Sequence, residues 1–162
     1  MTESHTFNPN DFDGAKAVRI RVFMEEQGFQ NEFDEVDQDP RTLEITARDS
    51  QGKPAGCARI FPSEMEPGVE TQEGRWVFGR LAVVPEHRHG GLGSQLLSYS
   101  EDEARKLGAT EMHLHAQVSV MPFYERAGYE AYGPVEYDEH VEHRWMRKGL
   151  ESSPAFQGTI FA

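Results

Sequence analysis

The stretch 77–108 constrains the fold of this chain more than any other part of the sequence. A short apolar run over 79–84 is closed by Pro85, which lacks a backbone donor and therefore ends a strand. A glycine-containing turn follows, and apolar residues then recur near helical spacing as far as Gly108, a residue type suited to a helix C-terminus. The sequence therefore predicts a strand, a tight turn, and a helix over roughly 92–107.

The turn between this strand and this helix is Arg88-His89-Gly90-Gly91-Leu92-Gly93. Its glycines leave the first N–H groups of the helix uncovered, where the helix dipole also favours an anion. Arg88 would add positive charge at the same place. The turn therefore predicts a seat for a pyrophosphate, and the alternative is a glycine turn that only joins strand to helix.

Two other glycine-rich phosphate loops do not match this turn. A P-loop ends in Gly-Lys-Ser/Thr, whereas here Gly93 is followed by Ser94 and Gln95. A dinucleotide-binding fingerprint would need a third Gly or Ala where Leu96 stands. Neither class of nucleotide site is predicted.

The motif Arg88-x-x-Gly91-x-Gly93, directly after a strand that ends at Pro85, resembles the acetyl-CoA motif of the GNAT superfamily of N-acetyltransferases. Downstream, Ala116-Gln117 and the segment 122–129 resemble the second GNAT signature, F-Y-E-x-x-G-F. Two motifs in the expected order make the resemblance specific.

Three further segments resemble the ElaA-like branch of that superfamily: Arg21–Gly28, Glu32-Phe33-Asp34-x-x-Asp37 and His143–Met146. The resemblance covers about residues 7–148. It departs from the branch at Glu139–His143, where only the last His of the usual Gly-Ile-Pro-His is kept.

The order of the predicted elements indicates an α/β protein with a mixed (α+β) sheet and helices on both faces. The expected elements are a short strand at Thr6-Phe7, a helix Ala15–Gln27 ending at Gly28, strands at 43–49, 54–61 and 111–116, a helix Val120–Ala127, and closing strands at Tyr129–Tyr132 and His140–Lys148. On the first helix, Val18, Val22 and Phe23 are assigned to the core side, and Arg19, Arg21, Glu25 and Glu26 to the opposite side. The resemblance implies the GNAT acyl-CoA N-acyltransferase fold, with a central sheet of six to seven strands. We expect one domain over 5–149 and a C-terminal tail over 150–162.

The resemblance also implies how acetyl-CoA would bind. In that family the main chain of the strand before the turn pairs with the pantetheine arm, and the amides of the turn hold the pyrophosphate. The corresponding cofactor-binding residues here are Leu81, Ala82, Val83, Arg88, His89, Gly90, Gly91, Leu92, Gly93, Ser94, Gln117 and Phe123.

Acetyl transfer to an amine also requires a proton for the leaving thiolate and a base for the amine. Tyr124 matches the family position whose hydroxyl protonates the sulfur, and a buried core tyrosine is the alternative. The central strand offers no acid, so the base candidates are Glu26, Glu32 and His143, with Asp34 and His115 also open. Phe29 and Asp34 are expected at the acceptor site.

The net charge of −12, from 28 acids against 16 Lys and Arg, argues against nucleic acid as a partner. Five acids fall in the loop 29–40, in the part that forms one wall of the acceptor cleft in the family. We therefore expect a cationic small-molecule or peptide amine as the acceptor. A merely solvated loop is the alternative.

The single cysteine, the histidine pairs and the N-terminus do not predict a further catalytic or metal site. Cys57 is the only cysteine and is expected in the core rather than as a nucleophile. The pairs His87/His89 and His113/His115 lack a third placed ligand, so no metal site is predicted. The N-terminus lacks the pattern of a signal peptide and no apolar run could span a membrane, so we expect a cytoplasmic protein without membrane partners. A homodimer and a monomer are both open.

These observations together predict an acetyl-CoA-dependent N-acetyltransferase that moves the acetyl group directly to a primary amine, without a metal. The alternative from another class is an acyl-CoA-binding sensor that has kept the cofactor seat and lost turnover. Tyr124 favours the enzyme, whereas the lack of an obvious base keeps the sensor open.

Overall fold

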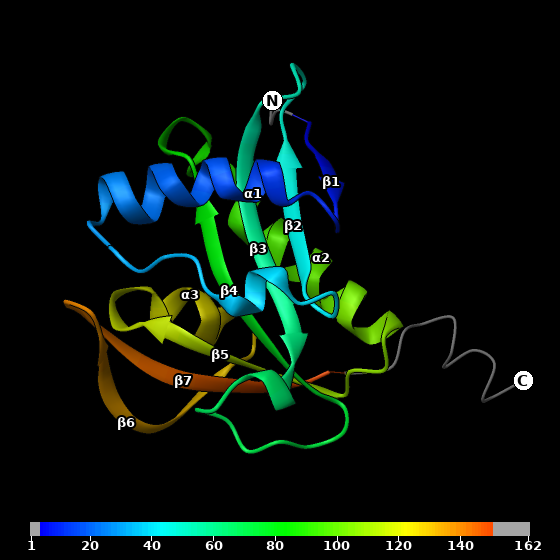
Figure 1. Cartoon of the computed structure of the whole chain (residues 1–162), viewed down its shortest axis with the longest axis vertical. Helices are drawn as coiled ribbons and strands as arrows, with labels where there is room; N and C mark the ends of the chain where they lie inside the picture. Colours follow the sequence, from blue (N-terminus) through cyan, green and yellow to red (C-terminus); the bar gives the residue numbers. More distant parts are fainter. Residues whose placement is uncertain (1–3, 151–162) are drawn as a thin grey trace, which may run out of the picture. The chain divides into compact units, whose positions relative to one another are not determined.

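The computed structural model describes residues 4–150 and has a seven-stranded sheet in the order β1-β2-β3-β4-β5-β7-β6 (Figure 1). The described chain divides into two compact units. Unit 1 holds the residues up to Phe61 together with Phe78–Ser100, and unit 2 holds Pro62–Val77 and the residues from Glu101 onward. The predicted mixed α/β fold is confirmed, while the tail expected over 150–162 lies, apart from Leu150, outside the described residues.

The elements agree closely with the predicted order. The strands are β1 (Thr6–Asn8), β2 (Leu43–Arg48), β3 (Pro54–Pro62), β4 (Arg75–Val83), β5 (Glu111–Gln117), β6 (Glu130–Asp138) and β7 (Val141–Gly149). The α-helices are α1 (Phe12–Arg19), α2 (Leu92–Lys106) and α3 (Met121–Arg126). Short 3₁₀ turns are η2 (Glu35–Gln38), η3 (Ser63–Met65), η4 (Pro85–His87) and η5 (Val118–Val120). The largest difference in a strand is β6, which continues six residues beyond the expected end at Tyr132.

The first helix is not a regular α-helix throughout. Asp11 caps its start, accepting a hydrogen bond from Gly14 N at 3.0 Å. From Ile20 to Glu26 the helix is a π-helix, η1, and Gln27 N donates to Val22 O, five residues back, at 3.1 Å. Gly28, with φ of 79°, ends it as predicted.

Helices cover both faces of the sheet within unit 1. β2 and β3 pair antiparallel, with Thr46 opposite Cys57 and Ala47 opposite Gly56. Thr46 faces Gly14 on α1, whereas Gly56 faces Leu92 and Leu96 on α2. Because neighbouring residues of a strand point to opposite faces, α1 and the first half of α2 lie on opposite sides of these strands.

The layer between α2 and these strands is apolar. It contains buried side chains from β2, β3 and the start of α2, namely Ile45, Ala47, Ala58, Ile60, Leu92, Leu96 and Leu97. The layer below α1 contains buried charges instead, and Arg19 there has no exposed surface. The prediction that Arg19 lies on the outer side of the helix was therefore wrong.

Unit 2 contains an antiparallel sheet of β5, β7 and β6, with His115 opposite Trp145 and Gln117 opposite His143. Met112, Leu114 and Met146 are buried on one face. His113, His115, His143 and Trp145 occupy the alternating positions and so share the other face. Gly128, with φ of 99°, follows α3 and ends it as predicted.

Candidate active site

The glycine turn between η4 and α2 has a backbone conformation that exposes N–H groups. His89 and Gly91 have φ of 72° and 84°, and such left-handed residues turn successive N–H groups toward one concave side. Gln95 N donates to Gly91 O at 3.1 Å as α2 begins, so the N–H groups earlier in the helix have no intrahelical acceptor. No described atom lies within 4 Å of the point where a Cβ on Gly91 would stand. The turn therefore has the conformation, the donors and the space that a phosphate requires.

Arg88 does not add free charge to this turn, contrary to the prediction. Its guanidinium forms a bidentate ion pair with Glu26, at 2.7 and 2.8 Å, and its Nε donates to Val83 O at 2.8 Å. The hydrogen bond from Arg88 lowers the pKa of Glu26. A carboxylate with a lowered pKa is a weaker base, so this geometry disfavours Glu26 as the base.

The strand before the turn carries an unusual backbone conformation. Arg80, in β4, has φ of 56°, which costs free energy in a residue other than glycine and is held by its surroundings. Its guanidinium donates to the backbone carbonyl of Glu32 at 3.0 Å and its Nε lies 2.8 Å from the Glu32 carboxylate. Leu81 and Val83 are half-buried, and Ala82 between them is buried.

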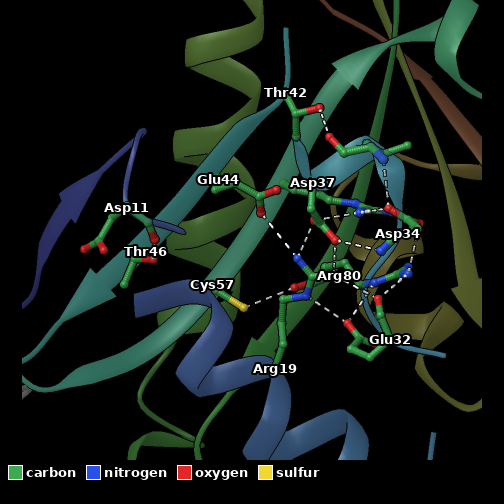
Figure 2. A network of polar contacts seen from close by, with 12 residues as sticks. Asp11, Arg19, Glu32, Asp34, Asp37, Thr42, Glu44, Thr46, Cys57 and Arg80 are labelled. Carbon is green, nitrogen blue, oxygen red and sulfur yellow. Dashed lines mark hydrogen bonds and ion pairs between the residues drawn. The ribbon is translucent and has the colours of Figure 1, made fainter. Parts of the chain in front are cut away.

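A network of charges fills the layer below α1, and all of its members belong to unit 1 (Figure 2). Arg19 donates to Glu32 Oε2 at 2.8 Å and to Asp37 Oδ1 at 2.7 Å. Arg59 bonds Asp37 at 2.8 Å and Asp34 at 2.9 Å. The network comprises three guanidiniums and four carboxylates: Arg19, Arg59, Arg80, Glu32, Asp34, Asp37 and Glu44.

Two carboxyl groups of this network, Glu44 and Asp37, have pKa values shifted in opposite directions. Glu44 is buried, receives a single hydrogen bond from Arg19 at 3.4 Å, and its Oε2 is a buried oxygen that accepts no hydrogen bond within residues 4–150. Burial and the neighbouring Asp37 raise the pKa of Glu44 to about 8. Burial also acts on Asp37, but hydrogen bonds from Arg19 and the charge of Arg59 outweigh it and hold its pKa well below the usual range. A proton on Glu44 leaves three negative charges to match the three guanidiniums.

This network changes the interpretation of the acidic loop 29–40. Glu32 and Asp37 have buried side chains directed at arginines, so the expectation that all five carboxylates face an acceptor was wrong. Asp34 is bonded by Arg59, which outweighs the effect of burial and lowers its pKa. Burial raises the pKa of Glu32 against the opposing charges of Arg80 and Arg19. Phe29 is buried too, with its ring 6.2 Å from that of Phe23.

The predicted acid, Tyr124, lies in unit 2, on α3. Its side chain is buried and forms edge contacts with the rings of Phe123, at 5.1 Å, and Tyr129, at 6.0 Å. Burial raises the pKa of its hydroxyl, which therefore keeps its proton at neutral pH. Gln117 is the last residue of β5, and Phe123 is half-buried. Gln117, Phe123 and Tyr124 of the second motif all belong to unit 2.

His143, the remaining base candidate, is buried on β7 and its Nδ1 is 3.0 Å from Val141 O. Its ring stacks on that of His115, with centroids 5.0 Å apart. His115 in turn stacks on Trp145 and lies near Glu136. Alternation along β5 and β7 puts the rings of His115, His143 and Trp145 on one face of the sheet. Glu136, which lies near His115, comes from the part of β6 beyond the end of the predicted strand.

Cys57 is a core residue, as expected. It is buried, its Sγ lies 3.4 Å from Arg80 O, and burial raises its pKa to about 12. A thiol that stays protonated at neutral pH is a poor nucleophile. Within residues 4–150, no group of three or more His, Cys, Asp or Glu side chains is arranged to hold a metal ion.

Comparison with known proteins identifies the family. The family model described as an acetyltransferase (GNAT) domain matches residues 10–150. The chain belongs to the GNAT acetyltransferase family. YjcF of Bacillus subtilis, named an uncharacterized N-acetyltransferase, is 30% identical to this GNAT chain over 144 residues, covering 87% of the chain and 94% of the relative.

Solved structures support the GNAT fold. An acyl-CoA N-acyltransferase from Pseudomonas aeruginosa has a TM-score of 0.76 at 24% identity, covering 91% of this chain and 99% of that one. ElaA from Escherichia coli has a TM-score of 0.74 at 19% identity, with the same coverage. Family membership indicates acyl-CoA-dependent acetyl transfer in general terms. None of the helices within the described part of this GNAT protein combines the length and apolarity needed to cross a bilayer.

Proposed function

We propose that this GNAT protein transfers the acetyl group of acetyl-CoA to a primary amine of a small molecule or peptide. The observation that carries this proposal is the turn 88–94, where two left-handed residues and an open helix N-terminus offer backbone donors to a pyrophosphate. His89, Gly90, Gly91, Leu92, Gly93 and Ser94 would hold the phosphates, and the main chain of 81–83 would pair with the pantetheine arm. When bound, acetyl-CoA supplies the activated acyl group.

We infer that Tyr124 supplies the proton that the leaving sulfur requires. Its hydroxyl is buried, and the raised pKa keeps it protonated at neutral pH, so a proton is present on Oη when the C–S bond breaks. Among the side chains of the second motif, only Tyr124 carries a hydroxyl on the short helix α3. The motif resemblance and this protonation state support the same role.

The amine must lose a proton before it attacks, and the structure narrows the candidates for the base. Glu26, Glu32 and Asp34 are all ion-paired with arginines. We therefore favour His143, whose Nδ1 lies 3.0 Å from Val141 O, or a water chain over these carboxylates.

The same ion pairs favour a second candidate function, an acyl-CoA-binding sensor without turnover. One pair of experiments separates the two functions. Calorimetric titration measures the binding of acetyl-CoA. Release of free CoA thiol across a panel of primary amines measures acetyl transfer. The enzyme requires both binding and amine-dependent thiol release, whereas binding without release from any amine would leave only the sensor.

We also place the protein in the ElaA-like branch of the family. The segments 21–28 and 143–146 and the likeness of the fold to that of ElaA support this assignment. Enzymatic profiling of both proteins on one amine panel tests it, because members of one branch should share their best amines.

A further inference from the structure

A pocket of about 400 Å³ lies entirely within unit 2, on the face of the sheet that carries the histidines. The walls come from the loop before β4 and from all three strands of this unit. The residues on which the inference depends are Glu66, Gly68, His115, Tyr132, Glu136 and Trp145.

The floor of the pocket is aromatic. Antiparallel pairing of β5 and β7 places His115 opposite Trp145, and their rings stack with centroids 4.7 Å apart and planes 28° apart. A Cβ on Gly68 would lie 2.9 Å from Trp145 Cζ2, so a glycine is needed where the loop rests against the indole. These contacts fix the indole and leave an aromatic surface at the bottom of the pocket.

The lining of the pocket is also negatively charged. It includes the carboxyl groups of Glu66 and Glu136 and, among residues 4–150, no Lys or Arg. Glu136 Oε1 lies 3.3 Å from His115 Nε2, and burial followed by the charge of His143 lowers the pKa of that imidazole, so it is neutral at pH 7. Two guanidiniums outside the lining contact residues of the pocket: Arg144 Nε donates to the backbone carbonyl of Gly133 at 2.9 Å, and Arg147 stands 4.9 Å over the Tyr132 ring.

We propose that this pocket binds a second, non-reacting ammonium group of the acceptor, so that the acceptor is a diamine or a longer polyamine. The proposal rests on the amine acetylation proposed above. Carboxylates and an aromatic face stabilise the charged form of an amine. A charged ammonium cannot attack a carbonyl carbon, so the group held here is not the one acetylated.

A matched pair of ligands tests this pocket. We would titrate the full chain by calorimetry with 1,4-diaminobutane and with n-butylamine, which differ by one ammonium group. Diaminobutane should bind more tightly, and Glu66→Gln and Glu136→Gln should each weaken it by about tenfold, as expected for loss of a charge-assisted contact. Glu142→Gln is the control, because Glu142 is exposed and alternates with His143 on β7, on the opposite face.

Turnover gives a second test with a different readout. Because the held ammonium group does not react, Glu136→Gln should raise KM for diaminobutane and leave kcat near that of the wild type. The KM for n-butylamine should stay the same in the variant. Circular dichroism of each variant verifies that the fold is kept.

A pH series tests the role of the imidazole. The charged or titratable groups that face His115 are Glu136 and Asp138 on β6, His143 on β7 and, across the pocket, Glu66. A protonated His115 would pair with Glu136 and compete with the ligand, so diaminobutane should bind more weakly at pH 5.5 than at pH 8. His115→Gln should reduce this difference.

The outcomes separate this inference from the proposed function. Wild-type affinity for diaminobutane in both Glu66→Gln and Glu136→Gln would overturn the pocket, even if acetyl transfer occurs. Binding that depends on these two residues, in a protein that transfers no acetyl group to any amine, would support the pocket and refute the acetylation. Equal binding of diaminobutane and n-butylamine would also overturn the pocket.

Discussion

Glu44→Gln should change how the stability of this protein depends on pH. The wild-type side chain is buried between Arg19 and an ionised Asp37, and its pKa is raised to about 8, from burial first and Asp37 second. Glutamine has nearly the same shape, keeps an acceptor for Arg19, and cannot ionise. The substitution therefore fixes this position in the neutral state that the fold prefers.

The sign and size of the effect follow from proton linkage. Because the folded pKa of Glu44 is raised, its contribution to stability is complete below pH 4.5 and is lost as pH rises to about 8. The interval from 4.5 to about 8 corresponds to at most about 5 kcal/mol, at about 1.4 kcal/mol per tenfold change in proton affinity. The lowered pKa of Asp37 stabilises the fold above pH 4. This contribution to stability does not change between pH 5 and pH 8.

The assay is urea unfolding of both proteins at pH 5, 6, 7 and 8. Burial lowers the pKa of His113 and His115, so their contribution rises with pH up to about 6.5 in both proteins. Only the difference between the two proteins isolates Glu44. We expect Glu44→Gln to gain about 3 kcal/mol over wild type between pH 5 and pH 8, somewhat below the upper limit because part of the change falls outside this pH range.

Glu35→Gln is the matched control, since Glu35 is exposed on η2. It removes one carboxylate from the same loop and should leave the pH dependence unchanged. A free-energy difference between wild type and Glu44→Gln that stays constant from pH 5 to 8 would show that Glu44 is ionised in the fold, and would refute its raised pKa.

Three other substitutions test the site and the network. Gly91→Glu should abolish acetyl-CoA binding in calorimetry with the circular dichroism spectrum kept, because it adds bulk and negative charge at the phosphate seat; retained affinity would remove the seat. Tyr124→Phe should lower kcat by about a hundredfold with little change in acetyl-CoA affinity, and an unchanged kcat would make Tyr124 a core residue. Arg19→Met should lower the unfolding free energy in urea by about 3–5 kcal/mol, because Glu32 and Asp37 lose a buried partner; a loss under about 1 kcal/mol would contradict the stabilising role of this cation.

Elements whose signals are local could be predicted from the sequence. Pro85, Gly28, Gly108 and Gly128 mark the ends of a strand and three helical segments, and each glycine has a positive φ in the structure. The conformation of the turn 88–94 follows only in part from its glycines, because Gly91 is left-handed but the other left-handed residue is His89. Such signals depend on one or two residues and their own backbone, so they hold without knowledge of the rest of the fold.

The charged network could not be predicted in this way, because its members come from five separate segments of the chain. One signal was nevertheless present. Arg19 follows Ala15 and Val18 and precedes Val22 at helical spacing, so it occupies a core position of the stripe. An arginine in such a position requires buried carboxylates, and the acidic loop 29–40 was the available source. The π-helix Ile20–Glu26 had no comparable signal in the sequence.

The network below α1 has a consequence for how this protein can diverge from its relatives. Replacing any one of its charged residues leaves a buried partner without compensation, so single substitutions there are selected against. Viable sequences should change several of these positions together, for example by losing Arg59 with Asp34, and the seven positions should covary in an alignment. A change in acceptor preference should then arise from substitutions outside these seven positions. Substitutions in the loop 29–40 should instead be accompanied by changes in β2, β3 and the first helix.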